Sequence, residues 1–224
     1  MPELPEVHTI VEDLKNNIPG YEIKKVHISN KYKVDDADLR HLLIKILEGN
    51  TIVNVSRLAK NILIKLDSGH ILRIHLAMTG RILIRNDEKL KDKWIRMILH
   101  LTKEKKKKKL VFSDMRMFGK IELLQEKDSS RLNNKYGPDI YKQDVSPKEF
   151  LNIIKSKNTN IKNALLDQKV ISGLGNIYVT DALFLSGIHP LTKTKHINIK
   201  SAEKLLENIK GVLEEGIKHR GSTL

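Results

Sequence analysis

The stretch NILIKLDSGHILRIHLAM, residues 61–78, contains two runs of alternating apolar and polar side chains, separated by the turn sequence DSG. Alternation with a period of two is typical of β-strands with one buried face, and Asp and Gly between two such runs indicate a hairpin. Similar runs stand on both sides of it, at residues 21–28, 51–59, 81–85, 94–101, 110–114 and 119–124. The first half of the chain is therefore predicted to be a β-sandwich or barrel.

Two amphipathic helices accompany these strands. One follows the prolines at the amino terminus and ends at Pro19 and Gly20. The other covers residues 39–47, with Gly49 as its predicted C-cap.

From residue 146 the apolar period changes to 3.6. Ser146 and Glu149 form a predicted capping box, and helical patterns continue at residues 160–168, 176–186 and 201–219. The polar stretch between the two halves has the composition of a linker and contains a Gly-Pro turn. We therefore predict an α+β protein with a β-domain at 1–125, a linker at 126–145 and a helical domain at 146–224.

The composition narrows the class of protein. The 224 residues include 41 Lys and Arg against 27 Asp and Glu, a net charge of +14, which is typical of a nucleic-acid binder but also of lysine-rich, AT-biased genomes. The absence of cysteine excludes a disulfide, a thiol nucleophile and a Cys-ligated zinc site within this sequence. The nine histidines lack metal-ligand spacing, so no metal site is expected. No stretch approaches the ~18 apolar residues of a membrane span, so we expect a cytoplasmic protein.

The amino-terminal sequence MPELPEV allows two interpretations. In the first, Pro5 and Glu6 only begin a helix, because proline suits the first helical position and a carboxylate there complements the helix dipole. In the second, removal of Met1 turns Pro2 into a free secondary amine, with Glu3 and Glu6 beside it to move protons.

Other motifs are weaker when taken singly. Gly173 and Gly175 permit a turn whose N–H groups face outward at the start of a helix, which suits a phosphate, although a plain turn is the commoner meaning. Tyr178 stands where a Rossmann motif needs its third glycine. Lys60 alone is by default a solvated lysine. The lysine-rich run at 103–109 is predicted to be a solvated hairpin tip that could add a non-specific phosphate contact.

HLAMTG and DMRMFG are turn-like segments with long side chains near a glycine. On spacing alone, Met78 and Phe118 are interpreted as core residues and Arg116 as a surface charge.

Six motifs in order, PELPEV, RLAK, HLAMTG, DMRMFG, GLGNIY and SGIHP, resemble the formamidopyrimidine-DNA glycosylase family, which is related to endonuclease VIII. The resemblance implies a β-sandwich followed by a helix–two-turn–helix domain, with DNA in the cleft between them. It also implies a bifunctional DNA glycosylase and abasic-site lyase that initiates base excision repair on damaged double-stranded DNA, as a monomer.

The resemblance assigns roles to residues. Pro2 would be the nucleophile at C1′, Glu3 the general acid/base, and Glu6 the residue that positions it, with Lys60 contacting a phosphate near the lesion. Three side chains would fill the space left by the flipped nucleotide, Arg116 facing the estranged base. The implied DNA contacts are Lys60, Met78, Arg116, Phe118, Gly175 and Asn176.

The motifs HLAMTG, the Arg116 and Phe118 pair, and GNIY followed by GIHP favour oxidised purines such as 8-oxoguanine and formamidopyrimidines. The endonuclease VIII branch, which prefers oxidised pyrimidines, usually has Gly where Leu4 stands. A damaged-DNA binder without turnover and, on charge alone, a basic RNA-binding protein are the other classes considered.

The sequence departs from the family at His8, commonly Glu, and at Met117, commonly a basic residue. Family members also continue past a segment like GSTL into a zinc finger with four cysteines, and this sequence has none. A truncated chain, a natural zinc-less member and a decayed enzyme all fit that departure. We expect no cofactor. We also expect the missing zinc finger to affect DNA affinity and damage discrimination more than the mechanism of strand cleavage.

Overall fold

The computed structural model describes residues 1–30, 32, 37–86 and 90–222. Its contacts divide the chain into two compact units. The first comprises Met1–Pro2, Ile10–Arg57 and Asn61–Ser129, and the second comprises Glu3–Thr9, Leu58–Lys60 and Ser130–Leu224.

One sheet of the first unit has the strand order β1-β6-β7-β5. Its strands are β1 (Glu22–Ile28), β5 (Gly80–Arg85), β6 (Ile95–Lys103) and β7 (Lys106–Asp114), paired antiparallel. Alternate side chains of these strands are buried, as the sequence predicts for a sheet with one covered face. They include Ile23, Leu99, Leu101, Leu110 and Phe112.

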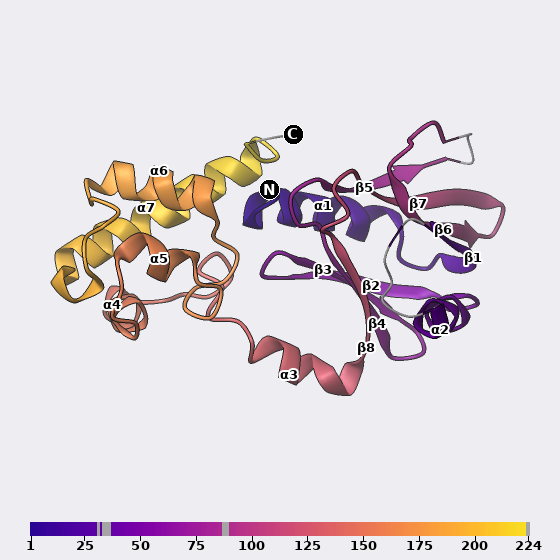
Figure 1. The fold of residues 1–224 in the computed structure, drawn as a ribbon, viewed down its shortest axis with the longest axis horizontal. Coiled ribbons are helices and arrows are strands. Elements are labelled where there is room, and N and C mark those ends of the chain that lie inside the picture. The colour runs from indigo at the N-terminus through magenta and orange to yellow at the C-terminus, as the bar shows by residue number, and fades with distance from the viewer. Residues whose placement is uncertain (31, 33–36, 87–89, 223–224) are drawn as a thin grey trace. The chain divides into compact units, whose positions relative to one another are not determined.

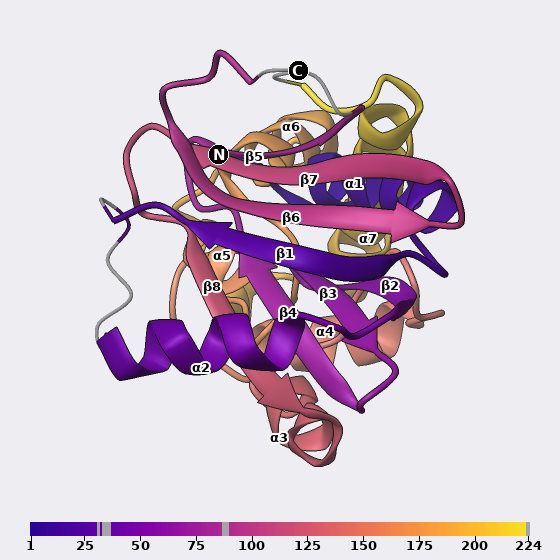
Figure 2. The same cartoon turned by 90° about the vertical axis from the view of Figure 1, so that its right-hand side faces the viewer.

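The other sheet has the order β2-β3-β4-β8. It consists of β2 (Ile52–Leu58), β3 (Asn61–Leu66), β4 (His70–His75) and β8 (Lys120–Gln125). β3 and β4 form the predicted hairpin, with Asn61 opposite His75 and Ile64 opposite Leu72. The strands of the two sheets cross at an angle (Figure 2), and the predicted sandwich is confirmed.

Two predicted helices are confirmed as α1 (Leu4–Asn17) and α2 (Ala37–Leu47). Gly49 has the left-handed backbone, with φ of 82°, that the predicted helix end requires. After β8, the stretch predicted as a linker contains a 3₁₀ turn, η1 (Glu126–Asp128), and the short helix α3 (Ser129–Asn133).

The lysine-rich hairpin differs from its prediction. The turn between β6 and β7 is confined to Glu104 and Lys105, and the following lysines already belong to β7. Lys103 pairs with Lys106 and Leu101 with Lys108. Pairing with β6 extends the strand through residues whose side chains carry no strand signal of their own.

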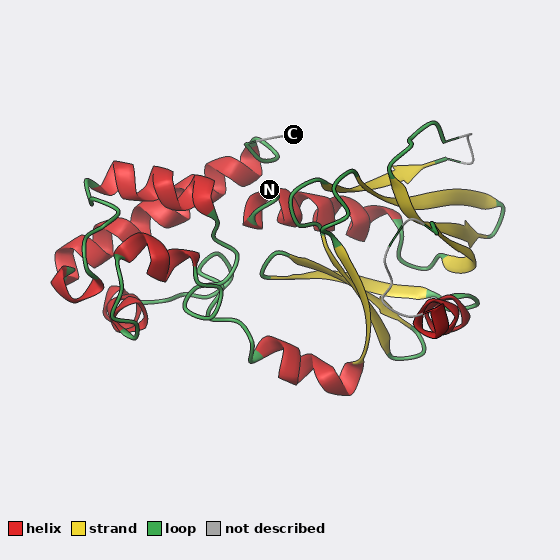
Figure 3. Cartoon of the chain, viewed as in Figure 1, coloured by secondary structure: helices red, strands yellow, loops and turns green. Residues whose placement is uncertain are grey.

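The second unit contains α4 (Pro147–Lys155), α5 (Ile161–Leu166), α6 (Asn176–Ser186), the 3₁₀ turn η2 (Thr194–His196) and α7 (Ile199–Lys218). Figure 3 shows helices and loops in this unit, and α6 lies alongside α7 (Figure 1). The predicted capping box is present, since the Ser146 side chain accepts from the Glu149 N–H and the Glu149 carboxylate accepts from the Ser146 N–H. Phe150, Leu165, Val179 and Leu205 belong to one buried apolar cluster.

In the part of the chain that the structure describes, no helix is long and apolar enough to cross a membrane.

Candidate active site

The amino end of α6 binds a carboxylate from the start of the chain. Gly175 is the N-cap and provides no side-chain cap. Instead the Ile177 N–H donates to Oε1 of Glu3 (3.0 Å) and the Tyr178 N–H to Oε2 (3.4 Å). A negative charge is stabilised at this end of the helix dipole. Two of the N–H groups expected to face a phosphate therefore hold Glu3, which is only 2% exposed.

The two glycines of the GLG turn make room for the amino-terminal residues. A Cβ at Gly175 would overlap the carboxylate of Glu3, and a Cβ at Gly173 would lie 2.6 Å from Cδ1 of Leu4. Gly173 also has φ of 90°, and its carbonyl accepts from the Leu4 N–H (3.0 Å). The glycines are needed because residues 3 and 4 pack directly against this turn.

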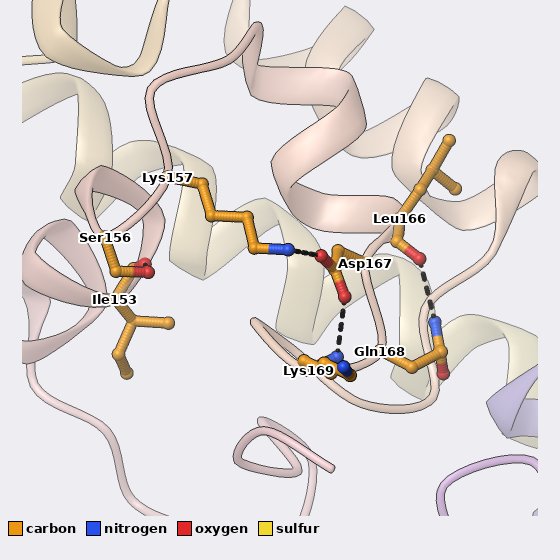
Figure 4. Close-up of polar contacts among 7 residues, drawn as sticks. All are labelled: Ile153, Ser156, Lys157, Leu166, Asp167, Gln168 and Lys169. Carbon is orange, nitrogen blue, oxygen red and sulfur yellow. Dashed lines mark hydrogen bonds and ion pairs between the residues drawn. The ribbon is translucent and has the colours of Figure 1, made fainter. Parts of the chain in front are cut away.

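The side chain of Gln168 holds the same turn from the other side. Its Nε2 donates to the carbonyls of Leu166 (3.1 Å) and Leu174 (2.8 Å), and its Oε1 accepts from the Gly173 N–H (2.9 Å). Figure 4 shows Gln168 beside Asp167, whose carboxylate pairs with Lys157 and accepts from the Lys169 N–H. The turn is thus fixed to the end of α5.

Glu6 connects three separate segments. Its Oε2 accepts from the Glu3 N–H (2.8 Å), while its Oε1 accepts from the Tyr178 hydroxyl (2.8 Å) and the Ser222 N–H (2.9 Å). Burial, followed by this hydrogen bond to Glu6, raises the pKa of Tyr178. Gly216 leaves space for the Tyr178 ring, and Gly221 lies against Glu6. Glu6 therefore fixes the backbone of Glu3 as well as beginning a helix.

Lys60 is buried in the same unit, 8% exposed, so its default interpretation as a solvated lysine is wrong. Burial lowers the pKa of its ammonium group, and the charges of Glu3 and Glu6 partly oppose that shift. Lys60 follows Ala59, which has a left-handed backbone with φ of 51°. The structure thus brings together Glu3, Glu6, Lys60 and Gly175.

Pro2 immediately precedes Glu3 in the chain and is partly exposed. The hydrogen bond from the Glu3 N–H to Glu6 therefore fixes the residue next to the predicted nucleophile. Asn176 is the first residue of α6 and is exposed. Their catalytic and DNA-binding roles remain predictions.

In the first unit, Asp114 connects the two turn-like segments. Its carboxylate is fully buried and accepts from the Thr79 hydroxyl, the Arg116 N–H (3.2 Å) and the Gly119 N–H (2.8 Å). Its carbonyl accepts from Nε of Arg96 (2.7 Å). One buried carboxylate thus holds the HLAMTG and DMRMFG turns together.

The long side chains on these turns are exposed. Met78 is 47% and Phe118 is 54% exposed, so their interpretation as core residues is wrong. The Arg116 guanidinium lies 4.9 Å from the centre of the Phe118 ring, and its Nη1 is 3.3 Å from Sδ of Met78. The three side chains therefore form one exposed cluster on a buried polar base.

The described residues do not fit the zinc site of the related family. The sequence contains no cysteine, and within the described ranges no three His, Cys, Asp or Glu residues are grouped to hold a metal ion. No step is therefore assigned to zinc.

Several residues of these clusters were not identified from the sequence. They are Thr79, Asp114, Gln168, Tyr178 and Ser222. Thr79 and Asp114 have a local signal, because they belong to the HLAMTG and D-x-R-x-F-G motifs. Tyr178 and Ser222 meet Glu6 across 172 and 216 residues, so no local pattern reveals them.

Comparisons with known proteins cover both halves of the chain. The formamidopyrimidine-DNA glycosylase N-terminal domain matches residues 1–121, and the formamidopyrimidine-DNA glycosylase H2TH domain matches residues 136–224. Proteins named formamidopyrimidine-DNA glycosylase from Herpetosiphon aurantiacus and Protochlamydia amoebophila are 35% and 36% identical. Each match covers all of this chain, with 81% and 79% of the respective relative.

Solved structures agree with these matches. A Lactococcus lactis FPG mutant in complex with a Fapy-dG containing DNA has a TM-score of 0.89 and 30% identity, over 100% of this chain and 81% of that chain. The wild-type L. lactis FPG (MutM) with an oxidized pyrimidine containing DNA has the same TM-score and identity, over 99% and 82%. The chain therefore belongs to the formamidopyrimidine-DNA glycosylase family of DNA repair enzymes.

Proposed function

We propose that this DNA glycosylase is bifunctional and excises oxidised purines, then cleaves the strand as an abasic-site lyase, with Pro2 as nucleophile. The arrangement of Glu3 carries the proposal. Its backbone N–H is bound by Glu6 and its carboxylate by α6, so the residue adjoining Pro2 is held at both ends. General acid–base catalysis needs a positioned side chain, and Glu3 offers a fixed carboxylate on the residue that follows the proposed amine.

The proposed chemistry begins with the Pro2 nitrogen after removal of Met1. This secondary amine attacks C1′ of the damaged nucleotide, the glycosidic bond breaks, and the base leaves with a proton. Opening of the sugar ring gives a cationic iminium on the proline nitrogen, which acidifies the C2′ proton. Loss of that proton expels the 3′ phosphate, and a second elimination expels the 5′ phosphate. Water then hydrolyses the iminium.

Glu3 would supply and accept protons around the sugar, with Glu6 positioning it. Lys60 would add a cation for the nearby phosphate. Met78, Arg116 and Phe118 would enter the duplex where the nucleotide is flipped out, because exposed apolar side chains on a rigid base offset lost stacking. Gly175 and Asn176, at the start of α6, complete the predicted contacts. The expected partner is damaged double-stranded DNA, acted on by a monomer, and no step calls on a cofactor.

The lesion class needs its own test. The L. lactis relatives were solved with a Fapy-dG containing DNA and with an oxidized pyrimidine containing DNA. The sequence favours oxidised purines, so the endonuclease VIII-like preference is the alternative.

Borohydride trapping tests the proposal directly. The protein, with removal of Met1 verified by mass spectrometry, is incubated with duplexes that contain 8-oxoguanine opposite cytosine, an oxidised pyrimidine or an abasic site. We expect covalent adducts on the abasic and 8-oxoguanine duplexes, mapped to Pro2, and a slower reaction on the pyrimidine.

Two controls make the result specific. A chain that retains Met1 has an amide at the Pro2 nitrogen, so it should form no adduct while still binding duplex. Pro2→Gly should lose most lesion cleavage without loss of duplex binding. Undiminished cleavage in either chain would exclude the proline mechanism. Binding without any adduct in the Met1-free protein would identify a damaged-DNA binder instead.

A further inference from the structure

The lysines of the β6–β7 hairpin are not explained by the enzyme's proposed chemistry. Lys103 and the run Lys105–Lys109 are in strands or the two-residue turn, so their positions follow from backbone pairing. Lysines often protect the edge strands of sheets from pairing with other chains. β6 and β7 are the two central strands of their sheet, as Figure 2 shows, so edge protection does not account for Lys109, which pairs with Arg85 of β5. Lys106–Lys108 extend beyond that pair, where β7 is locally an edge.

The cations are set directly opposite one another. Lys103 faces Lys106 across the hairpin. A second row crosses all four strands, from Lys25 through the neutral His100 to the like-charged pair Lys109 and Arg85. Like charges in such pairs destabilise a sheet. The arrangement therefore costs folding free energy, and a bound polyanion would offset that cost.

Few acidic side chains stand among these cations on the strands themselves. Among the described residues of the four strands and the β6–β7 turn, the acids are Glu22, Glu104 and Asp114. Glu22 pairs with Lys24 (2.6 Å), and Asp114 is buried at the far end of β7. Glu104 alone stands within the lysine run.

Two of the lysines attach the hairpin to the end of α1. Nζ of Lys108 donates to the Asn17 carbonyl (3.0 Å), and the ammonium groups of Lys103 and Lys108 lie 6.0 and 5.0 Å from the centre of the Tyr21 ring. A helix carboxyl end favours cations. The hairpin is thereby anchored, while Lys105, Lys106 and Lys107 are exposed at its tip.

We propose that a lysine surface, made of the outer-face cations Lys25, Arg85, Lys107 and Lys109 together with Lys105 and Lys106 at the hairpin tip, is a second, sequence-independent binding site for the phosphate backbone of duplex DNA. The choice of duplex DNA rests on the proposed function. From Lys109, the member of the surface nearest to it along β7, to Asp114 the strand rises by about 17 Å, so the surface is separate from the exposed cluster of Met78, Arg116 and Phe118. Such a site would retain the protein on undamaged DNA while it searches.

The test compares two triple variants that remove the same charge. The surface variant carries Lys105→Gln, Lys106→Gln and Lys107→Gln. The control variant carries Lys15→Gln, Lys45→Gln and Lys127→Gln, three exposed lysines of α1, α2 and η1 that lie outside the H2TH domain. Binding of an undamaged 30-bp duplex is measured by fluorescence anisotropy from about 50 to 200 mM KCl, the range over which phosphate contacts change affinity most.

In the surface variant we expect about tenfold weaker binding near 0.1 M salt and a log–log salt slope smaller by about 2 to 3, since each phosphate contact contributes about 0.9. The control variant should change less than threefold. Equal losses in the two variants would overturn the proposal, because net charge alone would then explain binding. A surface-specific loss on duplex RNA or on phosphatidylserine vesicles, with DNA binding unchanged, would overturn it in favour of that partner.

Lesion excision by the unaltered chain is measured in parallel. If the unaltered chain excises the lesion and the two variants bind DNA equally, the second DNA-binding site is excluded and the proposed function stands. If the surface variant alone loses DNA binding but the unaltered chain excises no lesion, the proposed function is excluded and the second DNA-binding site stands.

Discussion

The clusters of the two units are built in opposite ways. In the second unit, Glu3 and Glu6 are buried and their carboxylates are bound by backbone and hydroxyl donors. In the first unit, Asp114 is buried in the same manner, but the side chains that it positions are exposed. Groups proposed to move protons are therefore themselves fixed, whereas the side chains proposed to enter DNA are exposed on a fixed base.

The largest effect should come from Glu3→Gln. Removing the charge leaves the side chain similar in size but unable to accept and return a proton, so base excision should fall by about 10²- to 10⁴-fold. Single-turnover kinetics on an 8-oxoguanine duplex measure this. Cleavage of a preformed abasic site should fall less, and an unchanged excision rate would show that a buried, fixed carboxylate is not the proton carrier.

Gly175→Ala tests whether the cluster depends on close packing. The new Cβ would overlap the Glu3 carboxylate, so we expect a loss of about 1–3 kcal/mol in the free energy of unfolding together with slower excision. Gly211→Ala is the matched control, because no atom lies within 4 Å of its Cβ and alanine is favoured in a helix by about 1 kcal/mol. Urea denaturation measures the free energy of unfolding of both variants. Equal stability of the two variants would mean that Glu3 is free to move.

Asp114→Asn tests the buried base of the exposed cluster. Asparagine would place an NH₂ group toward a backbone N–H that now donates to the carboxylate, which should cost about 1–3 kcal/mol of folding stability. Phe118→Ala, at an exposed position, should change stability by less than about 0.5 kcal/mol. Thermal unfolding and duplex binding are measured for both. A larger loss of folding stability in Phe118→Ala than in Asp114→Asn would contradict the contrast between the buried carboxylate and the exposed side chains above it.

Tyr178→Phe should have the smallest effect and a characteristic pH dependence. Loss of the hydroxyl bond to Glu6 should cost about 1 kcal/mol at neutral pH. Because the folded-state pKa of Tyr178 is raised, the unfolded chain releases this proton near pH 10 while the folded chain retains it, so the stabilisation is lost as pH rises above about 10. Urea unfolding between pH 7 and 11 should therefore show that the difference in free energy of unfolding between the unaltered chain and Tyr178→Phe becomes smaller as pH rises. A difference that stays constant over this pH range would mean that the pKa of Tyr178 is not raised by folding.

Local patterns were sufficient where an element carries its own signals. α6 runs over the predicted residues 176–186 because Gly175 and Gly187 end it on either side. They failed for β7, whose lysines carry no strand signal and are held in the strand by β6. In the site, the residue types of Glu3, Glu6 and Lys60 suggested chemistry, but the burial of Lys60 and the contact of Tyr178 with Glu6 depend on partners far away in sequence.

The bond between Glu6 and Ser222 also has a consequence for synthesis. The two residues are 216 positions apart, so the ribosome has produced nearly the whole described chain before Glu6 acquires this partner. Domains generally fold as units and long-range contacts form late. A nascent chain that has not yet reached residue 222 would therefore contain Glu6 without its Ser222 partner.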